Sequence, residues 1–93
     1  MLTVRYSRNA RKAIEGYPGK LAQQIVRKIE ALRADPKPQD CQTLRGKLKP
    51  FLRVDVGEYR IIYRVEGAEL MIAAIGRRND DAIYKEFERA RRG

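Results

Sequence analysis

Apolar and polar residues alternate over residues 2–6, and this period of two predicts a short strand with one buried face. Ser7 follows as a candidate helix N-cap, and a first helix is expected over residues 8–15, before glycine and proline interrupt residues 16–19. In residues 20–34, apolar side chains recur at spacings of four, four and three, which predicts an amphipathic helix. This apolar stripe comprises Leu21, Ile25, Ile29 and Leu32. The N-terminal part of the chain therefore predicts a strand followed by a helical hairpin.

The C-terminal part predicts strands joined by tight turns. Residues 52–56 alternate between apolar and polar, and glycine-containing turns at 57–58 and 66–67 separate this strand from strands at 59–65 and 70–75. The last of these strands is an uninterrupted apolar run, which is typical of a strand buried on both faces in the middle of a sheet. Consecutive strands with such short connections predict an antiparallel meander.

A short C-terminal helix is expected after the last strand. Asp80 and Asp81 stand where a helix N-terminus favours acidic residues, ahead of Tyr84 and Phe87. The predicted fold class is α+β: an antiparallel β-sheet of about four strands packed on an N-terminal helical hairpin, with a short C-terminal helix. Residues 1–93 are expected to form a single domain.

The chain is strongly basic, and this charge points to a class of partner. Its 21 lysine and arginine residues oppose 12 aspartate and glutamate residues, which gives a net charge of +9 and an isoelectric point near 10.1. Such an excess is tolerated when a polyanion or an acidic partner neutralises it, and phosphate contacts supply most of the affinity of nucleic-acid binders. The alternative is a basic surface that serves only solubility. The local excess lies between residues 43 and 64, where Arg45, Lys47, Lys49, Arg53, Arg60 and Arg64 oppose Asp55 and Glu58.

Several kinds of enzyme are excluded by residue types that the sequence lacks. There is no histidine to act as a general base, and the one cysteine, Cys41, makes neither a zinc site nor an internal disulfide. No phosphate-binding loop or dinucleotide fingerprint appears, and the longest apolar run is too short for a membrane helix. We expect a cytoplasmic protein without membrane attachment, metal or cofactor. Any chemistry then depends on arginine, lysine, tyrosine and carboxylate side chains.

Strand periodicity places some of these side chains on shared faces. Arg53 and Asp55 lie two residues apart and project together from one strand, and Arg60 and Arg64 share a face of the next strand. A concave surface of arginines with an aromatic side chain could grip phosphates and stack a splayed base. The competing interpretation is that the arginines form a solvated face and that the tyrosines belong to the core. The segment after the last strand would add Arg77, Arg78 and Tyr84 to the surface.

Four segments resemble the RelE-type toxins of bacterial and archaeal toxin-antitoxin pairs. The order of the expected elements is also that of the RelE/ParE family, so the resemblance covers nearly the whole chain. The segments are Leu44-Arg45-Gly46, Leu52-Arg53-Val54, the run from Gly57 to Tyr63 with the sequence Gly-Glu-Tyr-Arg-Ile-Ile-Tyr, and the run from Ile75 to Tyr84 with the sequence Ile-Gly-Arg-Arg-Asn-Asp-Asp-Ala-Ile-Tyr.

The resemblance implies a site as well as a fold. In the ribosome-dependent nucleases of this family, cleavage uses basic residues on the sheet, an arginine after the central strand and a tyrosine near the C-terminus. The resemblance places Arg53, Arg60, Arg78 and Tyr84 at these positions, whereas Asp55 stands where the best-known members have a second lysine. Tyr84 and Asp55 are the candidates for proton transfer. Arg77 matches a flanking basic position of the family, and the local charge excess adds Arg45, Lys47, Lys49 and Arg64 as candidates for RNA binding.

The implied activity is metal-independent cleavage of mRNA on the ribosome, which inhibits translation. The attacking group is a ribose 2′-hydroxyl, and the target is its own neighbouring phosphate. The implied partners are mRNA, the ribosome and a cognate antitoxin whose acidic or amphipathic segment neutralises the toxin in a heteromeric complex. Two alternatives stay open: a ParE-like inhibitor of DNA gyrase, favoured by the acidic Asp55, and a catalytically inactive RNA-binding member of the family.

Overall fold

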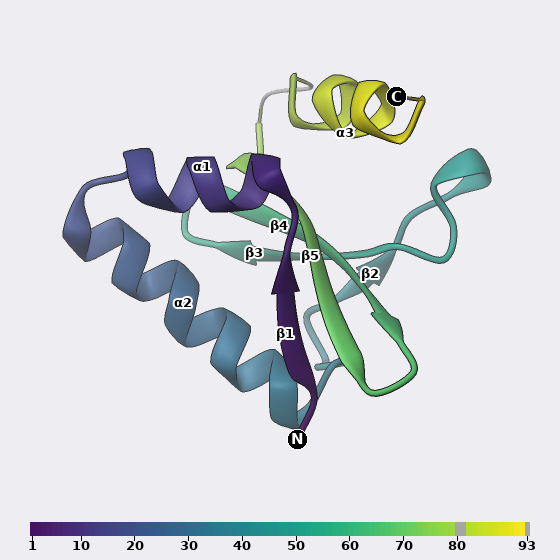
Figure 1. Cartoon of the computed structure of the whole chain (residues 1–93), viewed down its shortest axis with the longest axis horizontal. Helices are drawn as coiled ribbons and strands as arrows, with labels where there is room; N and C mark the ends of the chain where they lie inside the picture. Colours follow the sequence, from purple (N-terminus) through teal and green to yellow (C-terminus); the bar gives the residue numbers. More distant parts are fainter. Residues whose placement is uncertain (80–81, 93) are drawn as a thin grey trace.

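A mixed sheet of five strands forms the centre of the molecule (Figure 1). The computed structural model describes residues 1–79 and 82–92, so the predicted acidic helix start at Asp80 and Asp81 lies outside the described residues. The strands stand in the order β1-β5-β4-β3-β2. The elements are β1 (Thr3–Tyr6), α1 (Arg8–Gly16), α2 (Gly19–Ala34), β2 (Gln42–Thr43), a 3₁₀ turn (Gly46–Leu48), β3 (Leu52–Val56), β4 (Tyr59–Glu66), β5 (Glu69–Arg77) and α3 (Ala82–Arg92).

The predicted meander is confirmed for β3, β4 and β5, which pair antiparallel in sequence. Gly57 and Gly67 occupy the two hairpin turns at φ angles of 59° and 60°, a left-handed conformation that glycine adopts without strain. The expectation of a wholly antiparallel sheet of about four strands needs two corrections. Strand β1 pairs with β5 in parallel, because the helical hairpin carries the chain back across the sheet, and the two-residue β2 adds an edge beside β3.

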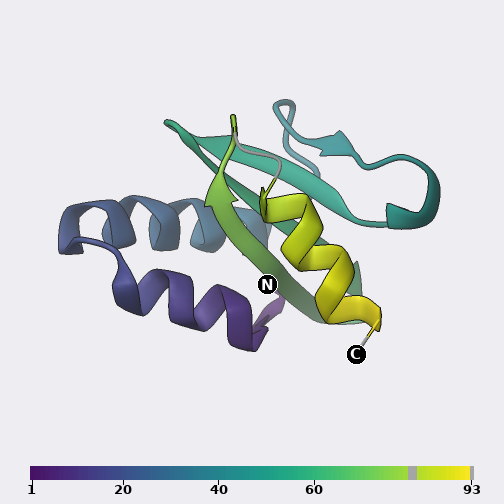
Figure 2. The same ribbon diagram turned by 90° about the horizontal axis from the view of Figure 1, so that it is seen from above.

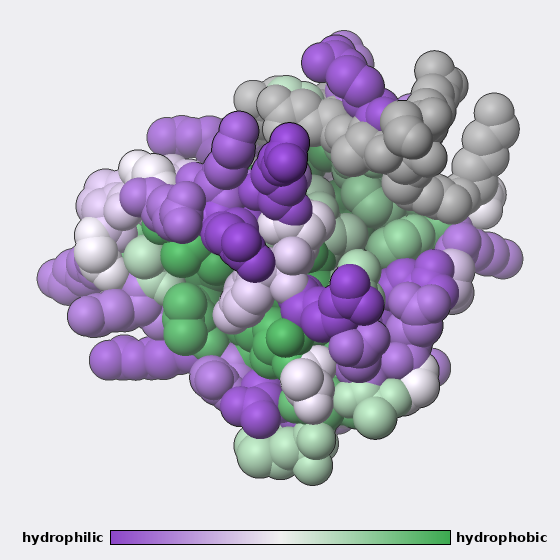
Figure 3. Space-filling model, in the orientation of Figure 1, coloured by the Kyte–Doolittle hydropathy of each residue, from purple (hydrophilic) through white to green (hydrophobic). Residues whose placement is uncertain are grey.

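The helical hairpin covers one face of the sheet (Figure 2). Ser7 caps α1 as predicted: its hydroxyl oxygen accepts a hydrogen bond from the backbone N–H of Ala10 at 3.0 Å, and its hydroxyl donates to the carbonyl oxygen of Ala73 at 2.7 Å. The predicted stripe of α2 is also confirmed, since Ile25, Ile29 and Leu32 are buried and Leu21 packs against them. Figure 3 shows hydrophilic side chains over most of the outer surface on this side, with apolar patches between them.

Tyr63 lies in the core between the hairpin and the sheet, as the competing interpretation of the tyrosines predicts. Its side chain is fully buried, and its hydroxyl donates to the carbonyl oxygen of Pro36 at 2.7 Å. Burial raises the pKa of this hydroxyl above its ordinary value, and the nearby Cys41 and Asp40 act in the same direction. Tyr63 therefore fixes the segment after α2 to β4 and is not a candidate for acid-base work.

Helix α3 covers the opposite face of the sheet, so β5 is buried on both faces as predicted. Ile83 and Phe87 of α3 pack on Ile62 and Ala74, and the Phe87 ring meets Phe51 edge to face at 4.6 Å between centroids. Within the described residues, no helix is both long and apolar enough to cross a membrane. The face of the sheet under α3 is where most of the predicted site residues lie.

Candidate functional site

Strands β3 and β4 bring the predicted polar residues to the α3 side of the sheet. Asp55 stands directly opposite Arg60 in the antiparallel register, and Arg53 stands opposite Ile62, whose side chain packs against α3. Directly opposite residues share a face of a sheet, so Arg53, Asp55 and Arg60 lie on one side, as the strand period predicts.

Arg60 is the centre of this arrangement, and only 13% of its side chain is exposed. Its Nε donates to Asp55 Oδ1 at 2.8 Å, and one terminal nitrogen donates to Asp55 Oδ2 at 3.4 Å. The other terminal nitrogen donates to the hydroxyl oxygen of Tyr84 at 2.5 Å. Burial alone would lower the pKa of Arg60, but the hydrogen bonds to Asp55 and Tyr84 outweigh it and raise the pKa above its ordinary value. Arg60 is therefore a fixed cation in an oriented network.

Arg78 reaches the same carboxylate from the end of β5. One terminal nitrogen of its guanidinium lies 3.9 Å from Asp55 Oδ2, and its backbone N–H donates to the carbonyl oxygen of Glu58 at 2.9 Å. About half of the Arg78 side chain is exposed, at 52%. Arg60, Arg78, Asp55 and Tyr84, which come from three separate parts of the sequence, therefore meet on one face.

Arg77 lies on the other face of the sheet, and a bulge in β5 decides this. The register runs from Ile62 opposite Ala74 to Tyr63 opposite Ile72, so one residue of β5 is extra at this point. The extra residue reverses the alternation of the strand, which turns Arg78 toward Asp55 and leaves Arg77 on the hairpin side, 5.7 Å from the ring centroid of Tyr59. The structure does not bring Arg77 to the predicted surface.

Comparison with protein families shows which family the chain belongs to. Residues 4–82 match the family described as the ParE toxin of the type II toxin-antitoxin system parDE. The chain belongs to this family. None of the curated proteins matches its sequence significantly.

Solved structures of related toxins share the fold of this toxin. A double mutant of the toxin RelE from E. coli in the free state superposes with a TM-score of 0.79 at 16% identity, over 96% of each chain. The toxin-antitoxin complex RelBE2 from Mycobacterium tuberculosis gives 0.72 at 24% identity, over 83% of this chain and 98% of that chain. The RelB-RelE antitoxin-toxin complex from Methanococcus jannaschii gives 0.66 at 22% identity, over 94% of this chain and 99% of that chain.

The remaining predicted RNA-binding residues of the toxin lie away from Arg60. Arg64 is four residues along β4, about 13 Å at the rise of a strand. Its guanidinium lies 5.4 Å from the ring centroid of Phe51 and pairs with Glu66 at 3.2 Å, so it is already engaged. Arg45 and Lys49 are exposed on either side of the 3₁₀ turn, and the side chain of Lys47 lies outside the described part of the chain.

Gln42 is a contact that the sequence did not reveal. It stands opposite Arg53 in the register of β2 and β3, and its side-chain oxygen accepts a hydrogen bond from the Arg53 guanidinium. A two-residue strand has no periodic pattern, so only the pairing itself could have identified this partner.

Among the described residues, no group of histidine, cysteine, aspartate or glutamate side chains could hold a metal ion.

Gly76 sets how closely α3 approaches the site. It stands opposite Arg60 in the register of β4 and β5, and a Cβ atom added there would lie 3.1 Å from the Cβ of Ile83. Because Ile83 precedes Tyr84, the absence of a side chain at Gly76 allows the tyrosine to reach Arg60.

Gly76→Ala is expected to lower the free energy of unfolding by about 1–3 kcal/mol, since the new methyl group crowds a packed helix. Denaturant unfolding followed by circular dichroism measures this change. The matched control is Gly16→Ala at the end of α1, where an added Cβ would meet no heavy atom within 4 Å. Equal stability of the two variants would contradict the close packing of α3 on β5.

Proposed function

We propose that this toxin is an endoribonuclease that cleaves mRNA on the ribosome without a metal ion. The observation that supports the proposal is the position of Arg60, which is held by Asp55 on one side and by Tyr84 on the other, with Arg78 beside it. A fixed guanidinium presents parallel N–H donors that match two phosphate oxygens. Asp55 accepts from Nε and one terminal nitrogen of Arg60, so the donors left for a phosphodiester are the remaining N–H groups of Arg60 and those of Arg78.

The proposed reaction is an attack by a ribose 2′-hydroxyl on the adjacent phosphorus. A bond forms between the 2′-oxygen and phosphorus, the bond from phosphorus to the 5′-oxygen breaks, and the products are a cyclic phosphate and a 5′-hydroxyl end. Negative charge accumulates on the phosphate oxygens as this happens. Arg60 and Arg78 stabilise that charge without reorganising, which is the largest contribution that a preorganised site makes.

Tyr84 is the proposed proton donor, and solvent takes the proton of the attacking hydroxyl. Tyr84 accepts a hydrogen bond from Arg60 through its oxygen, so its own hydroxyl proton can be donated to the leaving 5′-oxygen. Both oxygens of Asp55 already contact guanidinium groups, so the 2′-hydroxyl proton passes to solvent water, and water reprotonates Tyr84 after the leaving group has taken its proton. The ribosome would compensate by presenting the mRNA with the attacking oxygen already in line.

The proposal includes a cognate antitoxin that holds the toxin in a cytoplasmic heteromeric complex. Several structures of the same fold are toxin-antitoxin complexes, including RelBE2 from Mycobacterium tuberculosis and YoeB-YefM from Staphylococcus aureus. A net charge of +9 favours an antitoxin with an acidic or amphipathic segment. Such a segment would neutralise the surface that otherwise receives RNA.

Inhibition of DNA gyrase is the second candidate, and Asp55 favours it. The carboxylate already accepts hydrogen bonds from Arg60 and lies near Arg78, where a phosphate would bind. A toxin that acts through a protein surface would not need those guanidinium groups to be available. A catalytically inactive RNA-binding protein is consistent with the same contact.

Purified toxin added to translating ribosomes is expected to yield mRNA fragments with 5′-hydroxyl ends, mapped by primer extension. The same preparation incubated with gyrase and relaxed DNA should leave supercoiling unchanged. Inhibited supercoiling with intact mRNA would assign the toxin to gyrase. Bound but uncleaved mRNA would assign it to the inactive class.

A further inference from the structure

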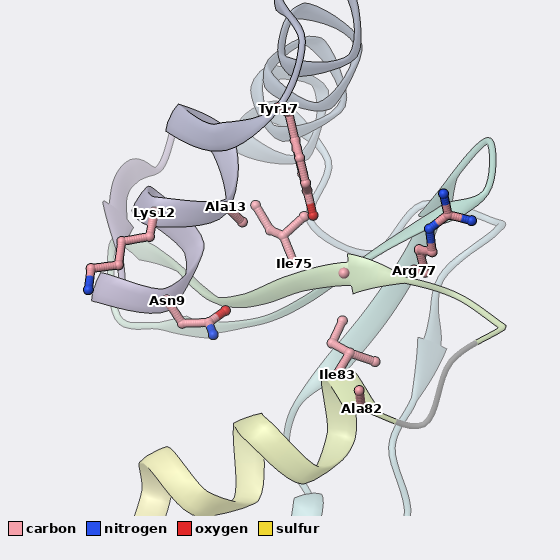
Figure 4. A pocket seen from close by; sticks show the side chains of 9 residues that line it. Asn9, Lys12, Ala13, Tyr17, Ile75, Arg77, Ala82 and Ile83 are labelled. Carbon is pink, nitrogen blue, oxygen red and sulfur yellow. The ribbon is translucent and has the colours of Figure 1, made fainter.

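A groove lies between α1 and the start of α3, at the edge of β5 beyond the end of β1 (Figure 4). Strand β1 pairs with β5 only as far as Ile72, and within the described residues no other strand covers this edge from there to Arg77. The groove has a volume of about 430 Å³, within the range of sites for small ligands. The residues that matter for its chemistry are Asn9, Lys12, Tyr17, Ile75, Arg77 and Ile83.

The groove combines positive charge with an aromatic and apolar lining. Lys12 and Arg77 stand at its opposite ends, while Tyr17 points toward β5 and Ile83 rises from α3 (Figure 4). Among the described residues, no carboxylate lies within 4.0 Å of the charged nitrogens of Lys12 or Arg77. This contrasts with Arg60, whose charge Asp55 already balances.

Tyr17, which lines the groove, contacts Tyr59, which packs against the core on the hairpin side. Their rings lie 5.1 Å apart between centroids at an interplanar angle of 59°, and the Arg77 guanidinium lies over the Tyr59 ring. Cations that follow a backbone, combined with aromatic rings that receive bases, are the usual means of binding single-stranded nucleic acid.

We propose that this groove binds a nucleotide of single-stranded RNA next to the phosphate held by Arg60 and Arg78. Arg77 and Arg78 are consecutive residues on opposite faces of the sheet, with Cα atoms about 3.8 Å apart. An RNA strand that leaves Arg78 therefore meets the groove as it passes the end of β5. The statement that the groove lies next to the cleaved phosphate rests on the proposed function. The statement that the groove binds RNA rests on its lining residues.

The test measures the affinity of the full-length toxin for a fluorescent single-stranded RNA of mixed sequence, by anisotropy at several salt concentrations. The double variant Lys12→Ala/Arg77→Ala is expected to bind at least about tenfold more weakly and to reduce the slope of log Kd against log salt by about 1 to 2. The matched control is Lys20→Ala/Arg27→Ala, which removes two exposed charges from α2 and should keep most of the affinity. Circular dichroism verifies that each variant is folded.

Tyr17→Leu tests the aromatic part separately. It keeps apolar volume but removes the ring, and a loss of about fivefold or more in RNA affinity with an unchanged salt slope is expected. Unchanged RNA affinity in this variant would mean that no base stacks on Tyr17, and the proposal would be overturned.

The remaining outcomes separate this inference from the proposed function. If the double variant keeps its RNA affinity and salt slope, or if the wild-type toxin does not bind the RNA at low salt, the groove is not an RNA site. If it keeps RNA affinity but loses affinity for an acidic antitoxin peptide, the groove belongs to a protein partner and the inference is again overturned. If the double variant loses RNA affinity while Arg60→Ala still cleaves mRNA, the groove stands and the proposed catalytic site falls.

Discussion

Arg60→Ala is expected to reduce mRNA cleavage on ribosomes by about 100- to 1,000-fold and to abolish growth inhibition on induced expression. The reason is geometric, because Arg60 contacts both Asp55 and Tyr84 and its remaining N–H groups are the donors proposed to bind the phosphate. Arg60→Lys should restore little activity, since a lysine keeps the charge but not the planar pair of donors. Cleavage is measured by the rate of appearance of the 5′-hydroxyl fragments.

Arg5→Ala is the matched control for Arg60→Ala. Arg5 is an arginine of the same sheet, but it lies on β1, which β5 separates from β4, and its 62% exposed side chain pairs with Glu69. It removes the same charge from the toxin and is expected to keep activity within about twofold, since exposed ion pairs contribute little. Equal loss in both variants would mean that total charge, and not the position of Arg60, governs toxicity.

The sequence was sufficient to predict the features that depend on local patterns. The Ser7 cap, the buried stripe of α2 and the shared face of Arg53 and Asp55 all follow from side-chain periods or from a single capping residue. The opposition of Asp55 and Arg60 is also nearly local, because a tight turn at Gly57 fixes the register of the β3–β4 hairpin. This pair is the part of the site that strand patterns come closest to defining.

Features that depend on pairing between segments far apart in the sequence could not be predicted from local patterns. The parallel pairing of β1 with β5 joins segments from opposite ends of the chain, and no local period records it. The bulge in β5 lies within an uninterrupted apolar run, where a change of face leaves no trace in the sequence. The sequence ended this strand at residue 75 and placed Arg77 and Arg78 on one surface, but β5 continues to Arg77, so the two side chains lie on opposite faces. The bulge decides which of them faces Asp55.

Asp55 competes with RNA for the two arginines of the phosphate site, because its carboxylate already contacts Arg60 and Arg78. A phosphate that binds Arg60 and Arg78 must first displace the Asp55 carboxylate, and the energy of the broken ion pair is subtracted from the binding energy of the phosphate. Asp55 therefore weakens RNA binding at the proposed phosphate site. A carboxylate that served as the general base would have the opposite effect, because its removal would stop proton transfer. The two roles therefore predict opposite signs for one substitution.

Asp55→Asn is expected to increase the affinity of the toxin for single-stranded RNA by about tenfold, or about 1.4 kcal/mol, and to leave the rate of cleavage of bound mRNA within about tenfold of wild type. Asp40→Asn is the control, since it makes the same change in net charge at an exposed residue that pairs with Lys28 at 2.8 Å, away from the site. A hundredfold drop in the cleavage rate with unchanged affinity would make Asp55 the base. If Asp40→Asn raises the RNA affinity equally, the effect comes from the total charge of the toxin. A direct competition for the donors of Arg60 and Arg78 requires a carboxylate that lies between them, as Asp55 does.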